Sequence, residues 1–351
     1  MSVTSIRGSK RPTIDDVAKA AGVSRGTVSR VLNGGHWVSP DALTAVEIAI
    51  KKTGYRINPH ARSLATSKAN TVAFLLSETQ ERLFEDPNFS ILMRGASEAL
   101  GEHDVSLVLI MAGTKDEQRR ARDFITAGHV DGVLLVSSHA RGQSIVGEIH
   151  RSGVPMIACG IPLGFEGKIG YVAADDATGA RDMVAYLRGL GRTGIATITG
   201  PMDTSGGVGR LRGYREQMGS DFDENLTAAG DYSRDSGRRA MRQLLDQAPD
   251  LDAVFAANDL MAAGALDVLR AAGKRVPEDV AVAGFDDSPV AASTEPQLTT
   301  MRQPFLRISH EMVRILLGVI RGDDPAAMIL PTHLVERAST KPSSAGLTVG
   351  T

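Results

Sequence analysis

Hydrogen-bonding side chains follow several short apolar runs from Thr71 onward. The runs TVAFLLS, VDGVLLVSS, AVFAAND and VAVAGFDD end on hydroxyls, amides and carboxylates: Ser77, Glu78, Ser137, Ser138, His139, Asn258, Asp259, Asp286 and Asp287. In folds built from parallel strands, ligands bind outside the carboxyl ends of the strands, where such residues would lie. These groups suit a hydroxyl-rich ligand better than a phosphate.

Motifs for other chemistry are missing from the sequence. No GxxxxGK[ST] phosphate loop is present, and no GxGxxG opens a helix in the right context. The eight histidines have no HExxH or other ligand spacing, so we expect no metal site. The single cysteine, Cys159, lies in the apolar run VPMIACG and is expected to be an inert buried thiol. No Ser/His/Asp set can be assigned, so we expect neither catalysis nor a cofactor.

The charge of the chain is unevenly distributed. Residues 1–68 contain 11 Lys/Arg and only 4 Asp/Glu, while the whole chain has a formal net charge of −2. The formal net charge is therefore +7 for residues 1–68 and −9 for residues 69–351. This asymmetry favours a polyanionic partner for the front, although a solvated face that binds nothing would have the same composition.

The stretch IDDVAKAAGVSRGTVSRVLNG, residues 14–34, has the pattern of a helix-turn-helix. Apolar residues recur at helical spacing with one break: Val17, Ala21, Val23, Val28 and Val31. Gly22 lies at the break, where a positive φ is accessible to glycine, and Ser24 can cap the second helix. An ordinary helical hairpin is the alternative interpretation.

The second helix, residues 25–32, would enter the major groove of DNA. Arg25 and Arg30 can each donate two hydrogen bonds to a guanine edge. Thr27 and Ser29 suit phosphate contacts or a thymine methyl, and the nearby glycine permits close approach.

Two further segments belong to this region. A helix over 41–53 would close the small core with three apolar residues: Leu43, Val46 and Ile50. The following GYRINPHARSLATSKAN contains Pro59, which can start a short helix that is marginal in isolation. Leu64 would then be an apolar wedge in the minor groove. A plain linker is the alternative.

Beyond Thr71, strand patterns and helix patterns alternate. This rhythm predicts parallel sheets with helices on both faces, and the number of units favours two similar α/β lobes. With 351 residues, two or three domains are expected. The sequence has neither a run of about 18 apolar residues nor a signal-peptide pattern, so a cytoplasmic location is expected.

Motifs in order along the chain carry a family resemblance. PTIDDVAKAAGVSRGTVSRVLNG, GRLRGYRE, AANDLMAAG, VPEDVAVAGFDDSP and PQLTTMRQP resemble the LacI/GalR (lactose repressor) family over about residues 12–338. SETQERLF and LDQAPDLDAVFAANDLM are most similar to its cellobiose-responsive repressors. The resemblance implies a transcriptional repressor with an all-α helix-turn-helix domain and a two-lobed core like periplasmic binding proteins.

The resemblance also implies domain boundaries. They are a headpiece over 1–58, a hinge helix and linker over 59–70, an effector-binding and dimerisation core over 71–338, and a disordered tail over 339–351. The first lobe would comprise about 71–172 and 301–328, and the second about 173–300 and 329–338. The small, polar tail lacks the leucine heptad of tetrameric relatives and favours a homodimer.

Site residues follow from the resemblance. The expected partner is a pseudo-palindromic operator in double-stranded DNA, bound through Thr13, Ser24, Arg25, Gly26, Thr27, Ser29, Arg30, Asn33, Tyr55, Asn58, Ala61 and Leu64. A small effector, expected to be a sugar such as cellobiose, would bind between the lobes through Phe89, Asp175, Arg210, Asn258, Asp286 and Gln303. The segment SETQERLFEDPNF is longer than its family counterpart, which leaves the roles of Glu78 and Phe84 open.

Three alternatives remain at this point. A corepressor-dependent regulator of the same family would bind DNA only with its ligand. A sugar-processing enzyme fused to a DNA-binding module would need a nucleophile and base at the strand ends. A transport-type sugar receptor would need an export signal.

Overall fold

The computed structural model describes residues 12–32, 38–55, 68–140 and 143–341. The chain divides into two units, residues 1–69 and 70–351. No helix among the described residues is long and apolar enough to cross a membrane.

The described part of the first unit contains three short helices around a small core: α1 (Ile14–Ala21), α2 (Arg25–Leu32) and α3 (Pro40–Thr53). A capping box between Thr13 and Asp16 begins α1, and Gly22 ends it with a φ of 67°. The core consists of five buried residues: Val17, Ala18, Val28, Val46 and Ala49. Leu43, predicted to belong to this core, is 42% exposed at the first turn of α3. This unit is a helix-turn-helix followed by a supporting helix.

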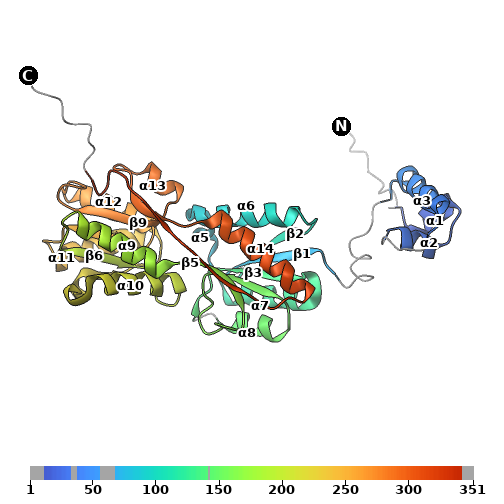
Figure 1. Ribbon diagram of the computed structural model, residues 1–351, viewed down its shortest axis with the longest axis horizontal. Coiled ribbons are helices and arrows are strands. Elements are labelled where there is room, and N and C mark those ends of the chain that lie inside the picture. Colours follow the sequence, from blue (N-terminus) through green and yellow to red (C-terminus); the bar gives the residue numbers. More distant parts are fainter. Residues whose placement is uncertain (1–11, 33–37, 56–67, 141–142, 342–351) are drawn as a thin grey trace, which may run out of the picture. The chain divides into compact units, whose positions relative to one another are not determined.

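The second unit consists of two α/β lobes (Figure 1). The first lobe is built on a parallel sheet of order β11-β5-β4-β3-β1-β2. Its strands are β1 (Thr71–Leu76), β2 (Ser106–Met111), β3 (Gly132–Val136), β4 (Met156–Cys159), β5 (Gly170–Ala174) and β11 (Ala327–Leu330). Its helices are α5 (Gln80–Glu85), α6 (Pro87–Gly101), α7 (Lys115–Phe124), α8 (Gln143–Arg151) and α14 (Phe305–Arg321).

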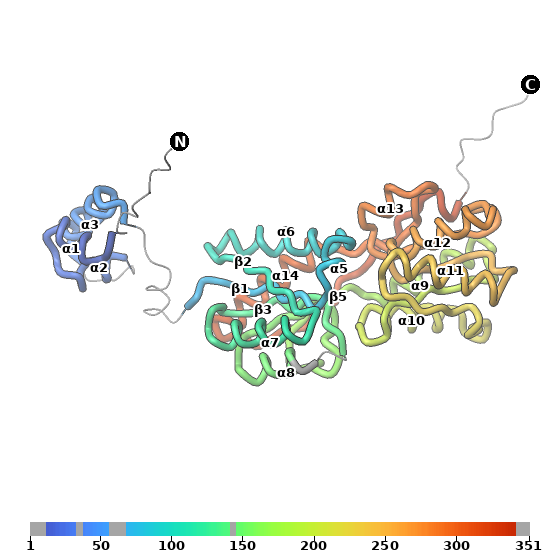
Figure 2. The backbone as a smooth tube through the Cα atoms, turned by 180° about the vertical axis from the view of Figure 1, so that it is seen from behind, coloured from blue at the N-terminus to red at the C-terminus, as the bar shows by residue number. Residues whose placement is uncertain are grey.

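Alternation along the central strand explains the layers of the first lobe. Val72, Phe74 and Leu76 of β1 face a core formed with α6 and α14, which lie side by side (Figure 2). Ala73 and Leu75 face the opposite core, formed with α7 and α8. Since β1 is buried on both faces, its sequence is a continuous apolar run.

The second lobe repeats this plan with the sheet order β12-β10-β9-β8-β6-β7, in which only β12 runs antiparallel to its neighbour. Its strands are β6 (Ile195–Thr199), β7 (Thr227–Ala229), β8 (Ala253–Ala256), β9 (Ala281–Asp286), β10 (Thr299–Arg302) and β12 (His333–Val335). Its helices are α9 (Asp176–Gly189), α10 (Ser205–Met218), α11 (Arg234–Gln247), α12 (Asp259–Ala271) and α13 (Pro289–Ser293). Helices α9 and α10 cover one face of the sheet, and α11 and α12 the other.

The chain crosses from one lobe to the other three times, and each crossing lies within about two residues of the lobe boundary predicted from the sequence. Strand β5 continues to Ala174, so the first lobe extends two residues beyond the expected 172. Strand β10 pairs with β9 as far as Arg302, and β11 pairs with β5 as far as Leu330. The returning segment of the first lobe is therefore about 303–330 rather than 301–328.

The expected disordered tail begins too early. Ser339 and Thr340 are buried, whereas residues 342–351 lie outside the described part of the chain. Ser339 Oγ donates to Val282 O at 2.6 Å and accepts from Thr299 N at 2.8 Å. Because these hydroxyls bond to β9 and β10, the polar segment continues the second lobe to at least residue 341.

Candidate effector cavity and DNA-binding helix

Helix α2 presents the residues expected to read bases. Arg25 is 70% exposed along its side chain, with a weak ion pair of 3.8 Å to Asp15. Arg30 and Gly26 are exposed, whereas Thr27 and Ser29 are half-buried. Helix α2 therefore carries two exposed arginines, whose side chains can each donate two hydrogen bonds to a guanine edge.

The other predicted DNA-binding residues fall into two groups. Thr13 caps α1, Ser24 accepts from Thr27 N at 3.1 Å, and Tyr55 packs against the small core. The remaining four lie outside the described residues: Asn33, Asn58, Ala61 and Leu64.

A cavity lies between the two lobes of the second unit and contains about 840 Å³ of open space, counted to its mouth. The polar lining comes from both lobes: Glu78, Arg82, Asp86, Asn88, Ser137, Ser138, Asp176, Thr204, Ser205, Arg210, Tyr232, Asn258, Asp286 and Gln303. Five of the six predicted effector residues line it: Phe89, Arg210, Asn258, Asp286 and Gln303.

Arg210 of α10 is the central cation of the cavity. Its Nε lies 2.8 Å from Asp176 Oδ1, its Nη1 lies 3.5 Å from Asp286 Oδ1, and it also donates to Ala257 O. Its guanidinium lies over the Phe285 ring, 3.9 Å from the centroid. Although burial opposes the charge, the two carboxylates raise the pKa of Arg210, so it stays charged.

Asp286, at the end of β9, connects the lobes. It accepts from Gln303 Nε2 at 2.6 Å and from Asn88 Nδ2 of the first lobe at 2.9 Å. Burial raises the pKa of Asp286 well above its ordinary value, against the opposing effect of Arg210. Its φ of 116° is rare for a residue with a side chain and marks a strained position held by its surroundings.

The sixth predicted residue, Asp175, does not line the cavity. Its carboxylate accepts from Thr178 N at 3.1 Å and caps α9. The next residue, Asp176, faces the cavity and pairs with Arg210 instead.

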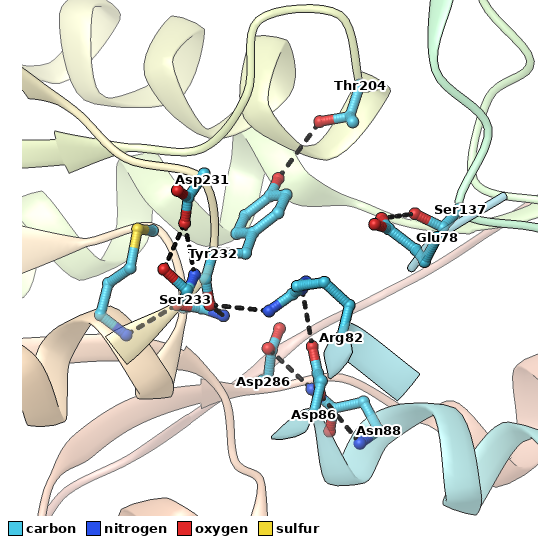
Figure 3. Close-up of polar contacts among 12 residues, drawn as sticks. Glu78, Arg82, Asp86, Asn88, Ser137, Thr204, Asp231, Tyr232, Ser233 and Asp286 are labelled. Atoms are coloured by element: carbon cyan, nitrogen blue, oxygen red, sulfur yellow. Dashed lines mark hydrogen bonds and ion pairs between the residues drawn. The ribbon is translucent and has the colours of Figure 1, made fainter. Parts of the chain in front are cut away.

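Arg82 and Tyr232 line the cavity without having been predicted. Arg82 of α5 donates to Tyr232 O across the cleft at 3.1 Å and pairs with Asp86 at 3.3 Å (Figure 3). The Tyr232 hydroxyl lies 3.3 Å from Thr204 Oγ1, and its carbonyl also accepts from Asn258 at 2.9 Å. The only signal for Arg82 was the lengthened segment around α5.

Two residues with open roles are now placed. Glu78 lines the cavity, whereas Phe84 is 84% exposed and does not.

Cys159 also lines the cavity. Burial raises the pKa of this cysteine to about 12, so the thiol remains protonated.

The arrangement suits a neutral ligand with many hydroxyls. Both arginines of the described lining already pair with carboxylates, Arg82 with Asp86 and Arg210 with Asp176 and Asp286. A phosphate would compete with these carboxylates, whereas hydroxyls can donate to carboxylates and accept from arginines together. Among the described residues, no group of three or more His, Cys, Asp or Glu could hold a metal ion.

Comparisons with known proteins agree with this geometry. Residues 13–58 match the family of bacterial regulatory proteins, lacI family, and residues 184–340 match the periplasmic binding protein-like domain. The chain is 46% identical over 336 residues to the HTH-type transcriptional regulator CelR of Thermobifida fusca, covering 94% of this chain and 98% of that protein.

Two solved structures are also similar to this chain in their three-dimensional fold. A CelR–cellobiose complex matches with a TM-score of 0.75 and 44% identity, covering 94% of this chain and 100% of the other. The lac repressor dimer bound to operator and an anti-inducer matches with a TM-score of 0.82 and 26% identity, covering 94% and 99%.

Proposed function

Since this chain belongs to the lacI family of bacterial regulatory proteins, we propose that it represses transcription from a specific operator and that cellobiose, or a related oligosaccharide, controls its operator affinity. The chain is a DNA-binding transcriptional regulator and not an enzyme. Two observations together support the choice of effector. The cavity has neutralised arginines and hydroxyl-binding groups from both lobes, and the CelR relative forms a complex with cellobiose.

The headpiece would supply DNA affinity in two ways. The excess of basic residues before residue 69 would attract phosphates in a salt-dependent manner. Arg25 and Arg30 of α2 would select the sequence, together with Ser24, Gly26, Thr27 and Ser29. We place Thr13, Asn33, Tyr55, Asn58, Ala61 and Leu64 at the backbone, hinge and minor-groove contacts, as the family resemblance implies.

The core would convert ligand binding into a change of lobe arrangement. A ligand shifts a conformational equilibrium only when it binds one state better than another. Asn88 and Arg82 of the first lobe already contact Asp286 and Tyr232 of the second, so a sugar here meets both lobes only when they are closed. Coupling of about 1–3 kcal/mol would change operator affinity about 5–150-fold.

We further propose a homodimer that works in the cytoplasm. A two-fold symmetric protein matches a pseudo-palindromic operator, and the lac repressor was solved as a dimer on its operator. The DNA-binding headpiece supports a cytoplasmic location, because the operator is found there.

A thermal-shift and calorimetric screen tests the effector assignment. The full chain is mixed with glucose, cellobiose, longer cello-oligosaccharides, lactose and cellobiose phosphate. We expect neutral cello-oligosaccharides to raise the Tm and to bind with one site per chain, and the phosphorylated sugar to do neither. A response to phosphorylated sugars alone would contradict the assignment. Gel shifts with and without the sugar then separate an inducer from a corepressor.

A further inference from the structure

His139 connects carboxylates of the two lobes beside the cavity. It follows β3 in the first lobe, and its side chain is 25% exposed. Its Nε2 lies 3.1 Å from Glu78 Oε1 of the same lobe, and its Nδ1 lies 3.2 Å from Asp203 Oδ1 of the second lobe. The backbone meets at the same point, since Ala140 N donates to Asp203 O at 2.7 Å. The imidazole therefore bridges the lobes.

The geometry requires a particular protonation state. A neutral imidazole has one N–H and one lone pair, whereas an imidazolium donates from both nitrogens. Carboxylate oxygens only accept, so with neutral His139 one ring nitrogen would direct a lone pair at a carboxylate. Both contacts are favourable at once only when His139 is positively charged.

The surroundings of His139 favour that charge. The hydrogen bond with Glu78 raises the pKa of His139, with Asp203 contributing and burial opposing. Burial acts to raise the pKa of Glu78, but His139, the Ser137 hydroxyl and the charge of Arg82 outweigh it and lower that pKa. Among the described residues that line the two hollows beside His139, those on α7, α8 and the loop after β4 are uncharged: Gln118, Val146, Pro162, Leu163 and Phe165.

The bridge also orients a residue of the effector cavity. Glu78 lines the cavity, and both Ser137 and His139 contact its Oε1. Its Oε2 takes part in neither contact, which leaves it to accept from a sugar hydroxyl. His139 itself does not line the cavity and would act on the ligand through Glu78.

We propose that His139 is a positioning residue for the effector site, whose imidazolium form joins Glu78 to Asp203, holds the lobes closed and strengthens effector binding as the pH falls. This proposal rests on the proposed function, because it takes the cavity to be the sugar site.

The direction of the pH dependence follows from linkage. The imidazolium bridge is fully present below the ordinary pKa of histidine and is lost as pH rises through the raised pKa of the closed state. Closure on the ligand therefore takes up protons near neutral pH. A difference of one pKa unit between open and closed states corresponds to about a tenfold change in affinity.

Titration calorimetry of the full chain with cellobiose tests the proposal. We expect weaker binding at about pH 8.5 than at about pH 6, and net proton uptake that shows as a dependence on buffer ionisation enthalpy. H139Q removes the second donor and should abolish both effects, and D203N should reduce them. The control H103Q changes an exposed histidine of the same lobe and should leave both effects intact.

The outcomes separate this proposal from the proposed function. Wild-type binding with the same affinity at both pH values and no proton uptake would overturn the His139 bridge and leave the sugar assignment standing. If cellobiose does not bind, the His139 bridge is tested by an NMR titration that measures the pKa of His139 in the ligand-free wild type and in D203N. The His139 resonance is assigned by its loss in H139Q. The bridge predicts a higher pKa for His139 in the wild type than in D203N, in proportion to the fraction of chains that are closed. An equal pKa in both proteins would refute it.

Discussion

Arg210→Met tests whether the buried ion pairs of Arg210 stabilise the core and support effector binding. The substitution keeps much of the side-chain volume but removes the only cation of the described cavity lining that contacts both Asp176 and Asp286. Breaking a buried ion pair by removing one partner costs about 3–5 kcal/mol. Hydrogen bonds to charged groups contribute about 1.5–3 kcal/mol each. We therefore expect the free energy of unfolding of the core to fall by about 3 kcal/mol and effector affinity to fall about 100-fold.

Urea unfolding and calorimetry with cellobiose measure the two effects. The matched control is Arg212→Met, two residues along α10, where the side chain is 65% exposed and lies 3.7 Å from Glu216. Exposed pairs contribute about 0–1 kcal/mol, so this variant should resemble the wild type in both assays. An Arg210→Met variant whose unfolding free energy lies within about 1 kcal/mol of the wild type, and whose sugar affinity lies within about threefold, would refute this role of Arg210.

Three further substitutions test other parts of the account. Arg25→Ala should lower preference for a selected operator over random duplex by about 1–3 kcal/mol in competition titrations, and unchanged preference would remove α2 from base reading. Gly200→Ala places a Cβ 2.4–2.5 Å from the Tyr232 ring, so sugar affinity should fall about tenfold, and a wild-type affinity would count against that ring as a cavity wall. Gly213→Ala places a Cβ 2.1 Å from a backbone carbonyl of α9 and should cost about 2 kcal/mol or more of unfolding free energy. Gly189→Ala, with no atom within 4 Å of the new Cβ, is its control and should be neutral or stabilising, and equal effects of the two would contradict the packing of α9 on α10.

Much of the architecture could be predicted from local pattern. The alternation of apolar runs and helical segments predicts two parallel α/β lobes, because each strand buried on both faces is a continuous apolar run. The spacing around Gly22 predicts the helix-turn-helix. The family resemblance, confirmed by the relatives, placed Arg210, Asn258 and Asp286 in one cavity.

The errors in the site have a local cause. Asp175 and Asp176 are adjacent carboxylates at the start of a helix, and only the backbone geometry decides which one caps α9 and which one faces Arg210. Pattern alone cannot separate them. The family resemblance pointed to Asp175, but the carboxylate that lines the cavity belongs to the next residue, Asp176.

Other residues were missed because tertiary contacts determine their positions. Tyr232 lies in the loop after the short strand β7, where its ring packs against Gly200 from a distant strand end. Arg82 reaches the cavity from the segment SETQERLFEDPNF, whose extra length sets it apart from the family pattern. Ser339 and Thr340 are small and polar, as in a tail, but their hydroxyls complete hydrogen bonds at β9 and β10. Composition does not reveal such contacts.

Fluorescence anisotropy with an operator selected from random duplexes tests the central claim most directly. Full-length protein is titrated into the labelled operator at fixed salt, with excess random competitor, in the absence and presence of saturating cellobiose. We expect a clear preference for the selected duplex and a change in its Kd of about fivefold or more on adding the sugar. No preference over random DNA at any ionic strength, or a Kd unaffected by every neutral mono- and oligosaccharide tested, would contradict it.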